Sequence, residues 1–250
     1  MVKRKSNSET LVIVPAAGFG RRVGSPIAKE MLRVKVAALG ARGVSKSLTE
    51  PMIAHCLDLA KTMNLAAHVI VRPEKKALVR YLKKRAQTQE LSVQIVGVTR
   101  EWPDTLLLSR PFWRAKNIVC LPDTRFRPLQ IFKVIDQRLR RTPLVWATFK
   151  AKDLKCWGAV DLKHKTHAEK PTSWVAGARG WGLFGFQKRY GVRVLESLLK
   201  STMNSRQSQG DGSEWRHLSI SQAGVELDQF QDLARKSSRA TLPHTTSQRP

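Results

Sequence analysis

The chain has 250 residues, of which 42% are hydrophobic, so it can bury the core of one large domain. No apolar run approaches the roughly 18 residues that a membrane span requires, and we expect a soluble protein of the cytoplasm. Its 45 Lys and Arg against 19 Asp and Glu give a net charge of +26, but these residues are spread along the whole chain without a basic stripe interleaved with aromatics, so we do not expect nucleic acid as a partner.

Strands and helices alternate through the first 150 residues. Short β-branched apolar runs predict buried strands, and apolar residues at helical spacing predict amphipathic helices. In chain order these are a strand at 11–15, a helix at 50–63, a strand at 66–72, a helix at 73–87, a strand at 92–98, a helix at 104–115, a strand at 117–123, a helix at 128–141 and a strand at 143–149. This alternation is typical of a Rossmann-like three-layer α/β/α fold with a mostly parallel central sheet.

The pattern changes after residue 150. Segments rich in Gly and Trp predict shorter strands, and a late helix follows them. These elements are expected at 156–162, 164–170, 177–187 and 189–203. Residues 204–213 predict a mobile loop, and 237–250 a disordered tail. We therefore predict a single domain over 1–236.

A glycine-rich turn follows the first predicted strand, in the stretch VPAAGFGRRVGSPIAKEML that starts at Val14. Ligands of a doubly wound sheet bind beyond the carboxyl ends of its strands, where this turn would lie. Gly18 and Gly20 let backbone N–H groups approach a phosphate, and Arg22 and Lys29 supply positive charge. An ordinary turn with exposed arginines is the alternative interpretation.

The same stretch resembles the signature of the nucleotidyltransferases that join a nucleoside triphosphate to a phosphorylated sugar or polyol. Gly18 and Gly20 match its glycines, Arg22 its arginine and Lys29 its lysine, whereas Ala28 stands where proline usually precedes the lysine. The resemblance implies that Arg22 and Lys29 are catalytic. Two cations beside the triphosphate would neutralise the charge that builds up when its α-phosphorus is attacked.

The resemblance also implies where the nucleotide binds. Base and ribose would lie near Ala16, Ala17 and Gly18. The segment EWPDTLLLS occupies the place of the family's segment beside the base, so 102–105 are expected there too, with Asp104 as a nucleotide-binding residue.

The predicted strand at 117–123 ends in VCLPD and resembles the family's strand that ends in a metal-binding aspartate. This implies that Asp123 is catalytic and binds magnesium, and a carboxylate at a strand end is the hard oxygen ligand that Mg²⁺ prefers. For the second metal ligand, an alignment on Asp232 and Leu233 selects Glu226, and Asp228 is the alternative. The family's Gly-Thr is absent here.

The segment WGAVDLKHKTHAEKP resembles the sugar-1-phosphate branch of the family. The resemblance implies that Gly158 lets a sugar ring approach the backbone, that Glu169 accepts sugar hydroxyls and that Lys170 holds the sugar phosphate. A surface turn would also explain the tripeptide at 169–171 taken alone. By this resemblance about 10–150 form a nucleotide-binding half and about 151–236 a sugar-binding half.

Together these motifs predict a Mg²⁺-dependent sugar-1-phosphate nucleotidyltransferase (an NDP-sugar pyrophosphorylase), with UTP or dTTP and glucose-1-phosphate as expected substrates. Two alternatives stay open. The segment PAAGFGRR and the short spacing between Arg22 and Lys29 resemble the methylerythritol-phosphate cytidylyltransferases, although the motif His-Asp-Ala-Ala-Arg of that family is absent. The high charge, Ala28 and the missing Asp-x-Gly-Thr would fit a non-catalytic relative that binds nucleotide or nucleic acid. A homo-oligomer is left open as well.

Overall fold

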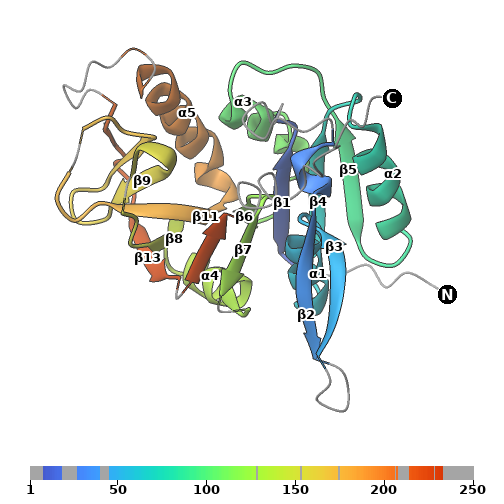
Figure 1. The fold of residues 1–250 in the computed structure, drawn as a ribbon. Coiled ribbons are helices and arrows are strands. Elements are labelled where there is room, and N and C mark those ends of the chain that lie inside the picture. The colour runs from blue at the N-terminus through green and yellow to red at the C-terminus, as the bar shows by residue number, and fades with distance from the viewer. Residues whose placement is uncertain are drawn as a thin grey trace, which may run out of the picture.

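The protein is built around one ten-stranded sheet (Figure 1). The structure, a computed structural model, describes residues 8–18, 27–39, 45–127, 129–152, 154–173, 175–205, 207, 214–227 and 229–232. The predicted loop at 204–213 is described only in part, and the predicted tail at 237–250 lies outside these ranges.

The first half alternates strands and helices, as predicted. Its strands in the main sheet are β1 (Thr10–Ala16), β4 (Ala66–Val71), β5 (Leu91–Ile95), β6 (Lys116–Cys120) and β8 (Leu144–Phe149). Its α-helices among the described residues are α1 (Ala54–Thr62), α2 (Lys76–Arg85), α3 (Trp102–Leu107) and α4 (Ile131–Leu139). β1 lies between β4 and β6 and is parallel to both, and β5 extends the sheet beyond β4.

The second half adds the strands β9 (Gly158–Asp161), β10 (Thr166–Glu169), β11 (Arg179–Gln187), β12 (Arg216–His217) and β13 (Gln222–Glu226), together with the helix α5 (Lys188–Ser205). Among the strands that the structure describes in this sheet, β10 and β11 are antiparallel to β1, and the others are parallel to it. The predicted Rossmann-like fold with a mostly parallel central sheet is therefore confirmed.

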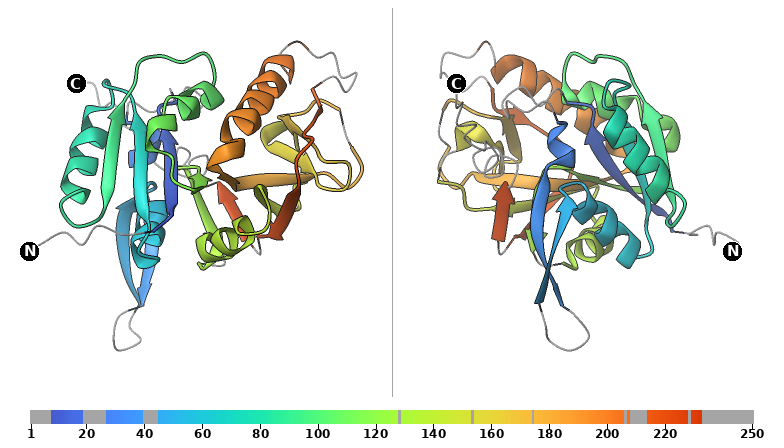
Figure 2. Two further views of the ribbon diagram at one scale, coloured as in Figure 1. Left: turned by 180° about the vertical axis from the view of Figure 1, so that it is seen from behind. Right: turned by 45° about the vertical axis from the view of Figure 1, so that its right-hand side comes forward.

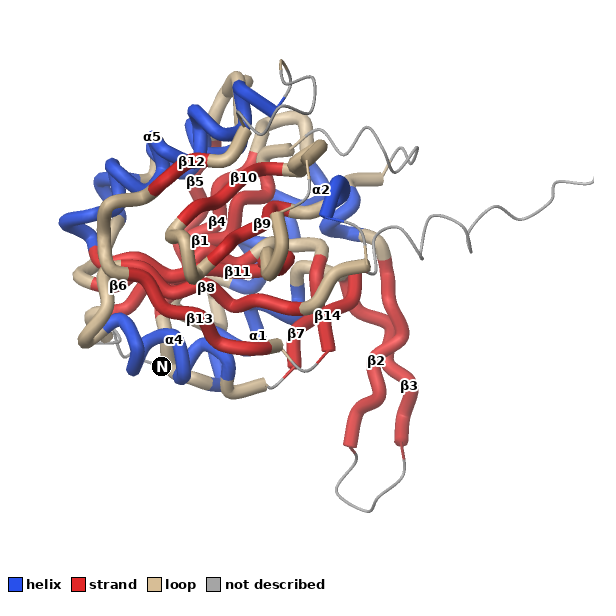
Figure 3. The backbone as a smooth tube through the Cα atoms, turned by 90° about the vertical axis from the view of Figure 1, so that its left-hand side faces the viewer, coloured by secondary structure: helices blue, strands red, loops and turns tan. Residues whose placement is uncertain are grey.

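Several elements differ from the predictions. A hairpin of β2 (Arg33–Leu39) and β3 (Ser45–Pro51) forms a separate small sheet that stands away from the body (Figure 3). The helix expected from residue 50 begins at Ala54, because the two residues before Met52 still belong to β3. The helix expected at 104–115 is α3 followed by a short 3₁₀ turn. A further small sheet joins β7 (Thr124–Arg127) to β14 (Gln229–Asp232).

Helices cover both faces of the sheet, which gives three layers (Figure 2). Alternate residues of β1 face opposite sides, as the pleat of a strand requires. Val12 and Val14 pack in one buried cluster with apolar residues of α1, α2 and α4. Leu11 and Ile13 pack in the other, with residues of α3 and α5.

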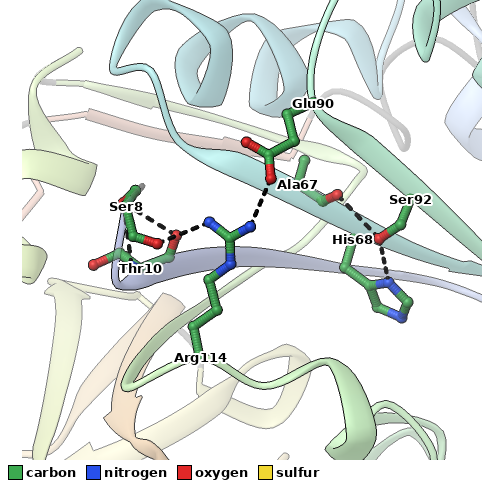
Figure 4. A network of polar contacts seen from close by, with 7 residues as sticks. All are labelled: Ser8, Thr10, Ala67, His68, Glu90, Ser92 and Arg114. Carbon is green, nitrogen blue, oxygen red and sulfur yellow. Dashed lines mark hydrogen bonds and ion pairs between the residues drawn. The ribbon is translucent and has the colours of Figure 1, made fainter. Parts of the chain in front are cut away.

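Polar contacts fix the strands of the first half at their amino ends (Figure 4). Arg114 donates to the carbonyl of Ser8 at 2.8 Å and to the Glu90 carboxylate at 2.6 Å, which joins the segments entering β1, β5 and β6. Within the sheet, Nδ1 of His68 on β4 lies 2.8 Å from the Ser92 hydroxyl on β5. These contacts fix the relative positions of the strands, and therefore of the loops at their carboxyl ends.

Two buried histidines and a half-buried one predict that the protein loses stability as the pH falls below about 6.5. Burial lowers the pKa of His55 and of His167 from 6.5 to about 4, and it also lowers the pKa of His68. Between pH 6.5 and about pH 4 the unfolded chain binds protons at His55 and His167 that the folded chain does not bind. The stability is thus complete above pH 6.5 and is lost toward pH 4, and at pH 5 His55 and His167 are each expected to cost about 2 kcal/mol.

Urea unfolding at pH 7.5 and pH 5 measures this loss. The Phe126 N–H donates to Nε2 of His55 at 3.0 Å, an interaction that a protonated ring cannot accept. His55→Gln should therefore flatten the pH dependence. Equal free energies of unfolding at the two pH values would contradict the prediction.

Candidate active site

The predicted phosphate-binding turn starts, at Gly18, where the carboxyl ends of three strands meet. β1 has β4 on one side, with Ala16 opposite Val71, and β6 on the other. The segments that leave these strands therefore emerge at the same edge of the sheet, where a doubly wound fold binds its ligands. Gly18 is exposed there, with open space where a side chain would lie. Gly20 and Arg22 lie outside the described residues.

Lys29 and Asp123 form an ion pair at this edge. Nζ of Lys29 lies 2.5 Å from Oδ2 of Asp123, and the two side chains are 22% and 18% exposed. Lys29 opens the short 3₁₀ helix η2 (Lys29–Met31), and Asp123 follows the end of β6. Lys29 and Asp123, which two different motifs predict to be catalytic, are 94 positions apart in the sequence and in contact in the structure.

A second ion pair, which the sequence reasoning missed, lies next to the first along the chain. Glu30 is completely buried, and its Oε1 accepts a hydrogen bond of 2.8 Å from Nζ of Lys75. The same Nζ donates to the Ala16 carbonyl at 2.7 Å, so Lys75 links the end of β1 to η2. Burial lowers the pKa of Lys75, and the neighbouring Glu30 carboxylate opposes that shift. A signal was present, because Lys75 follows the strand predicted at 66–72 and therefore lies at the ligand-binding edge.

Strand β11 joins the two predicted halves of the site. Its carboxyl part pairs with β6, with Leu183 opposite Cys120, and its amino end pairs with β9, with Gly180 opposite Ala159. The strand β8 pairs with one edge of β11. Both β6 and β9 therefore pair with its opposite edge, where they lie end to end. Leu183 and Gly180 are about 10 Å apart on an extended strand. The end of β6 and the start of β9, where Gly158 lies, are therefore neighbours.

Gly158 has a packing role in the structure. A Cβ at this position would lie 2.1 Å from Nε1 of Trp181, so the indole fills the space that a side chain would need. Trp181 also contacts Trp102, with ring centroids 5.7 Å apart, which connects the predicted sugar-binding half to the segment predicted beside the base. The contact predicted between Gly158 and a sugar stays a prediction.

Glu169 and Lys170 lie beside Gly158, because Glu169 is its partner in the register of β9 and β10. Glu169 is buried, and its Oε1 lies 3.4 Å from Nζ of Lys170, whose side chain is 41% exposed. Lys170 has a φ of 53°, in the left-handed region that only a few per cent of non-glycine residues adopt. Its N–H donates to the Trp157 carbonyl at 2.9 Å, which fixes this backbone turn.

Asp104 lies at the amino end of α3. Its carboxylate accepts the N–H of Glu101 at 3.3 Å and lies 3.5 Å from Nε of Arg100. The contact with Glu101 caps the amino end of the helix, which gives Asp104 a structural role beside its predicted one in nucleotide binding.

The structure does not bring Glu226 to Asp123. Glu226 ends β13, and β8 and β11 lie between β13 and β6, so the two strands are about 14 Å apart. Its exposed carboxylate instead lies 2.6 Å from Arg179, whose guanidinium lowers the pKa of Glu226. Asp228 lies outside the described residues. The register of β7 and β14 places Asp232 opposite Thr124, directly after Asp123.

The comparisons with known proteins find this fold among solved structures. No protein-family model matches the sequence, and no curated protein matches it. Among solved structures, the chain is similar to a putative glucose-1-phosphate thymidylyltransferase from Bacillus anthracis in complex with sucrose, with a TM-score of 0.67 and 15% identity over 92% of each chain. It is also similar to HddC from Yersinia pseudotuberculosis, with a TM-score of 0.60 and 12% identity, and to HddC complexed with GMP-PN, with 0.61 and 13%. Both HddC matches cover 92% of this chain and 96% of the other.

The chain therefore shares the fold of these structures over 92% of its length. Within the described ranges, the helices are too short or too polar to cross a membrane.

Proposed function

We propose that the protein is a sugar-1-phosphate nucleotidyltransferase, which joins a nucleoside triphosphate and a sugar-1-phosphate to give an NDP-sugar and pyrophosphate. The observation that carries this proposal is the Lys29–Asp123 pair at the carboxyl edge of the sheet, next to the start of β9. There Lys170 adds a second, partly exposed cation. The shared fold supports the general class of the enzyme.

In the proposed reaction a phosphate oxygen of the sugar-1-phosphate attacks the α-phosphorus of the triphosphate. The new bond forms in line with the bond that breaks, and the leaving oxygen departs with pyrophosphate. No covalent enzyme intermediate is needed. The chain contributes positions and charge: Arg22 and Lys29 bind the triphosphate, and Lys170 holds the incoming phosphate.

Asp123 would hold a magnesium ion in this site. The residues fit such an ion, because Mg²⁺ is usually bound by one or two carboxylates together with substrate phosphates and water. When bound, it would neutralise phosphate charge and polarise the phosphoryl oxygens. Among the described residues no group of three or more His, Cys, Asp or Glu is placed to hold a metal, so one carboxylate with the triphosphate is the arrangement we propose.

The test is pyrophosphate release, with Mg²⁺, from each common nucleoside triphosphate paired with glucose-1-phosphate, other sugar-1-phosphates and methylerythritol phosphate. We expect release with UTP or dTTP and glucose-1-phosphate. Release only from CTP and methylerythritol phosphate would replace the proposal by the cytidylyltransferase. Nucleotide binding without release from any pair would indicate a non-catalytic relative.

A further inference from the structure

A buried carboxylate lies beneath the loop that carries Lys170. Glu214 is completely buried, and its Oε1 accepts four hydrogen bonds from two consecutive residues. The backbone N–H and the hydroxyl of Thr172 donate at 3.0 and 3.2 Å. The N–H and the hydroxyl of Ser173 donate at 2.9 and 2.8 Å. The segment directly after Lys170 and Pro171 is therefore fastened to one oxygen atom.

The segment before Lys170 is fastened to the same residue through the helix α5. The N–H of Glu169 donates to the Ser201 hydroxyl at 3.1 Å, and this hydroxyl donates to the backbone carbonyl of Glu214 at 3.1 Å. Ser201 is completely buried as well. Glu214 thus anchors the chain on both sides of Lys170.

This anchoring matters because Lys170 has an unfavourable backbone conformation. A non-glycine residue at a φ of 53° persists only where its surroundings hold it. A buried carboxylate is costly unless several donors satisfy it, and hydrogen bonds to a charged acceptor are about twice as strong as neutral ones. The carboxylate therefore stabilises a loop geometry that the local sequence does not favour.

We propose that Glu214 is a positioning residue for the sugar-phosphate site, which holds Lys170 where it can bind the phosphate of the incoming substrate. The inference rests on the proposed function. Glu214 itself touches no substrate. Its contribution acts through the backbone of the loop at 169–173, so it should affect the sugar-1-phosphate and not the nucleotide.

The test compares Glu214→Ala with Asp161→Ala. Asp161 is a matched control, because it is another buried carboxylate that accepts two backbone N–H groups, from Lys163 at 2.9 Å and His164 at 3.2 Å. It lies at the opposite end of the β9–β10 hairpin from Lys170. Glu214→Ala should raise KM for the sugar-1-phosphate about 10- to 100-fold, because small displacements of binding groups have effects of this size. KM for the nucleotide should stay within about twofold in both variants.

The inference would be overturned in favour of a general structural role by either of two results. One is an equal rise in the KM for the sugar-1-phosphate in Glu214→Ala and Asp161→Ala. The other is an equal change in the KM values for the sugar-1-phosphate and for the nucleotide in Glu214→Ala. If Glu214→Ala does not fold, Glu214→Gln replaces it. That variant keeps the size and one acceptor oxygen but removes the charge, so it should give a smaller rise in the same KM.

Failure of the proposed function would show as a wild-type protein without turnover. The positioning role is then measured by hydrogen exchange of the Thr172 and Ser173 amides, which should be at least about tenfold faster in Glu214→Gln than in the wild type and unchanged in Asp161→Asn. Unchanged exchange in Glu214→Gln would overturn the inference independently of the reaction.

Discussion

Replacing Lys29 by methionine is expected to lower kcat for nucleotidyl transfer by about 100- to 1,000-fold, because preorganised groups that stabilise developing charge contribute on this scale. Methionine keeps much of the apolar stem and removes the ammonium group. Asp123→Asn should have a comparable effect, since it removes the charge of the proposed metal-binding carboxylate. Steady-state kinetics of pyrophosphate release, with circular dichroism to check the fold, measure both.

The chain offers a matched control for this prediction. Lys116 begins β6, and its Nζ lies 2.6 Å from Asp136, in a pair of similar exposure to that of Lys29 and Asp123. This pair lies at the amino end of β6, away from the ligand-binding edge. Lys116→Met should leave kcat within about twofold of the wild type. If both lysine substitutions lower kcat equally, Lys29 is only a structural residue and the proposed mechanism is wrong.

The first half of the fold could be predicted because its pattern is local. β1 and β4 are short, rich in β-branched residues and buried except at Pro15, and the apolar positions of α2 and α4 recur at helical spacing. The place of Asp123 could also be predicted, because the carboxyl ends of parallel strands meet at one edge whatever the details of the helices. The pair with Lys29 follows from two motifs that both lead to that edge.

The remaining features depend on contacts that a single sequence does not show. In the hairpin, Val34 and Val36 alternate with Arg33 and Lys35 in β2, but the residues of β3 are mostly polar. The strand β7 is completed by β14, more than 100 positions later. Glu214 follows a polar stretch that predicted only a loop, and nothing nearby indicates that its side chain reaches Thr172, 42 positions earlier. The alignment on Asp232 and Leu233 selects Glu226, but the order of the strands decides which acidic residue lies near Asp123.

Replacing Lys75 by methionine is expected to lower the free energy of unfolding by about 3–5 kcal/mol, the cost of leaving a buried charge without its partner. Glu30 is completely buried, and its Oε2 has no hydrogen-bond partner among the described residues, so the carboxylate depends on Lys75. The variant also loses the hydrogen bond to the Ala16 carbonyl. Urea unfolding at pH 7.5 measures the change.

Two further variants separate this cause from a general effect of losing a positive charge at an end of α2. Glu30→Gln combined with Lys75→Met should recover much of the lost stability, because no unpaired charge then remains in the core. Arg85, at the other end of α2, pairs with the partly exposed Asp58, and Arg85→Met should cost only about 0–1 kcal/mol. If the double variant is no more stable than Lys75→Met, the buried charge is not the cause. If the unpaired Glu30 charge is the cause, Lys75→Met should also lower kcat. Glu30 directly follows Lys29 in the same short helix, so a disturbance at Glu30 should displace Lys29.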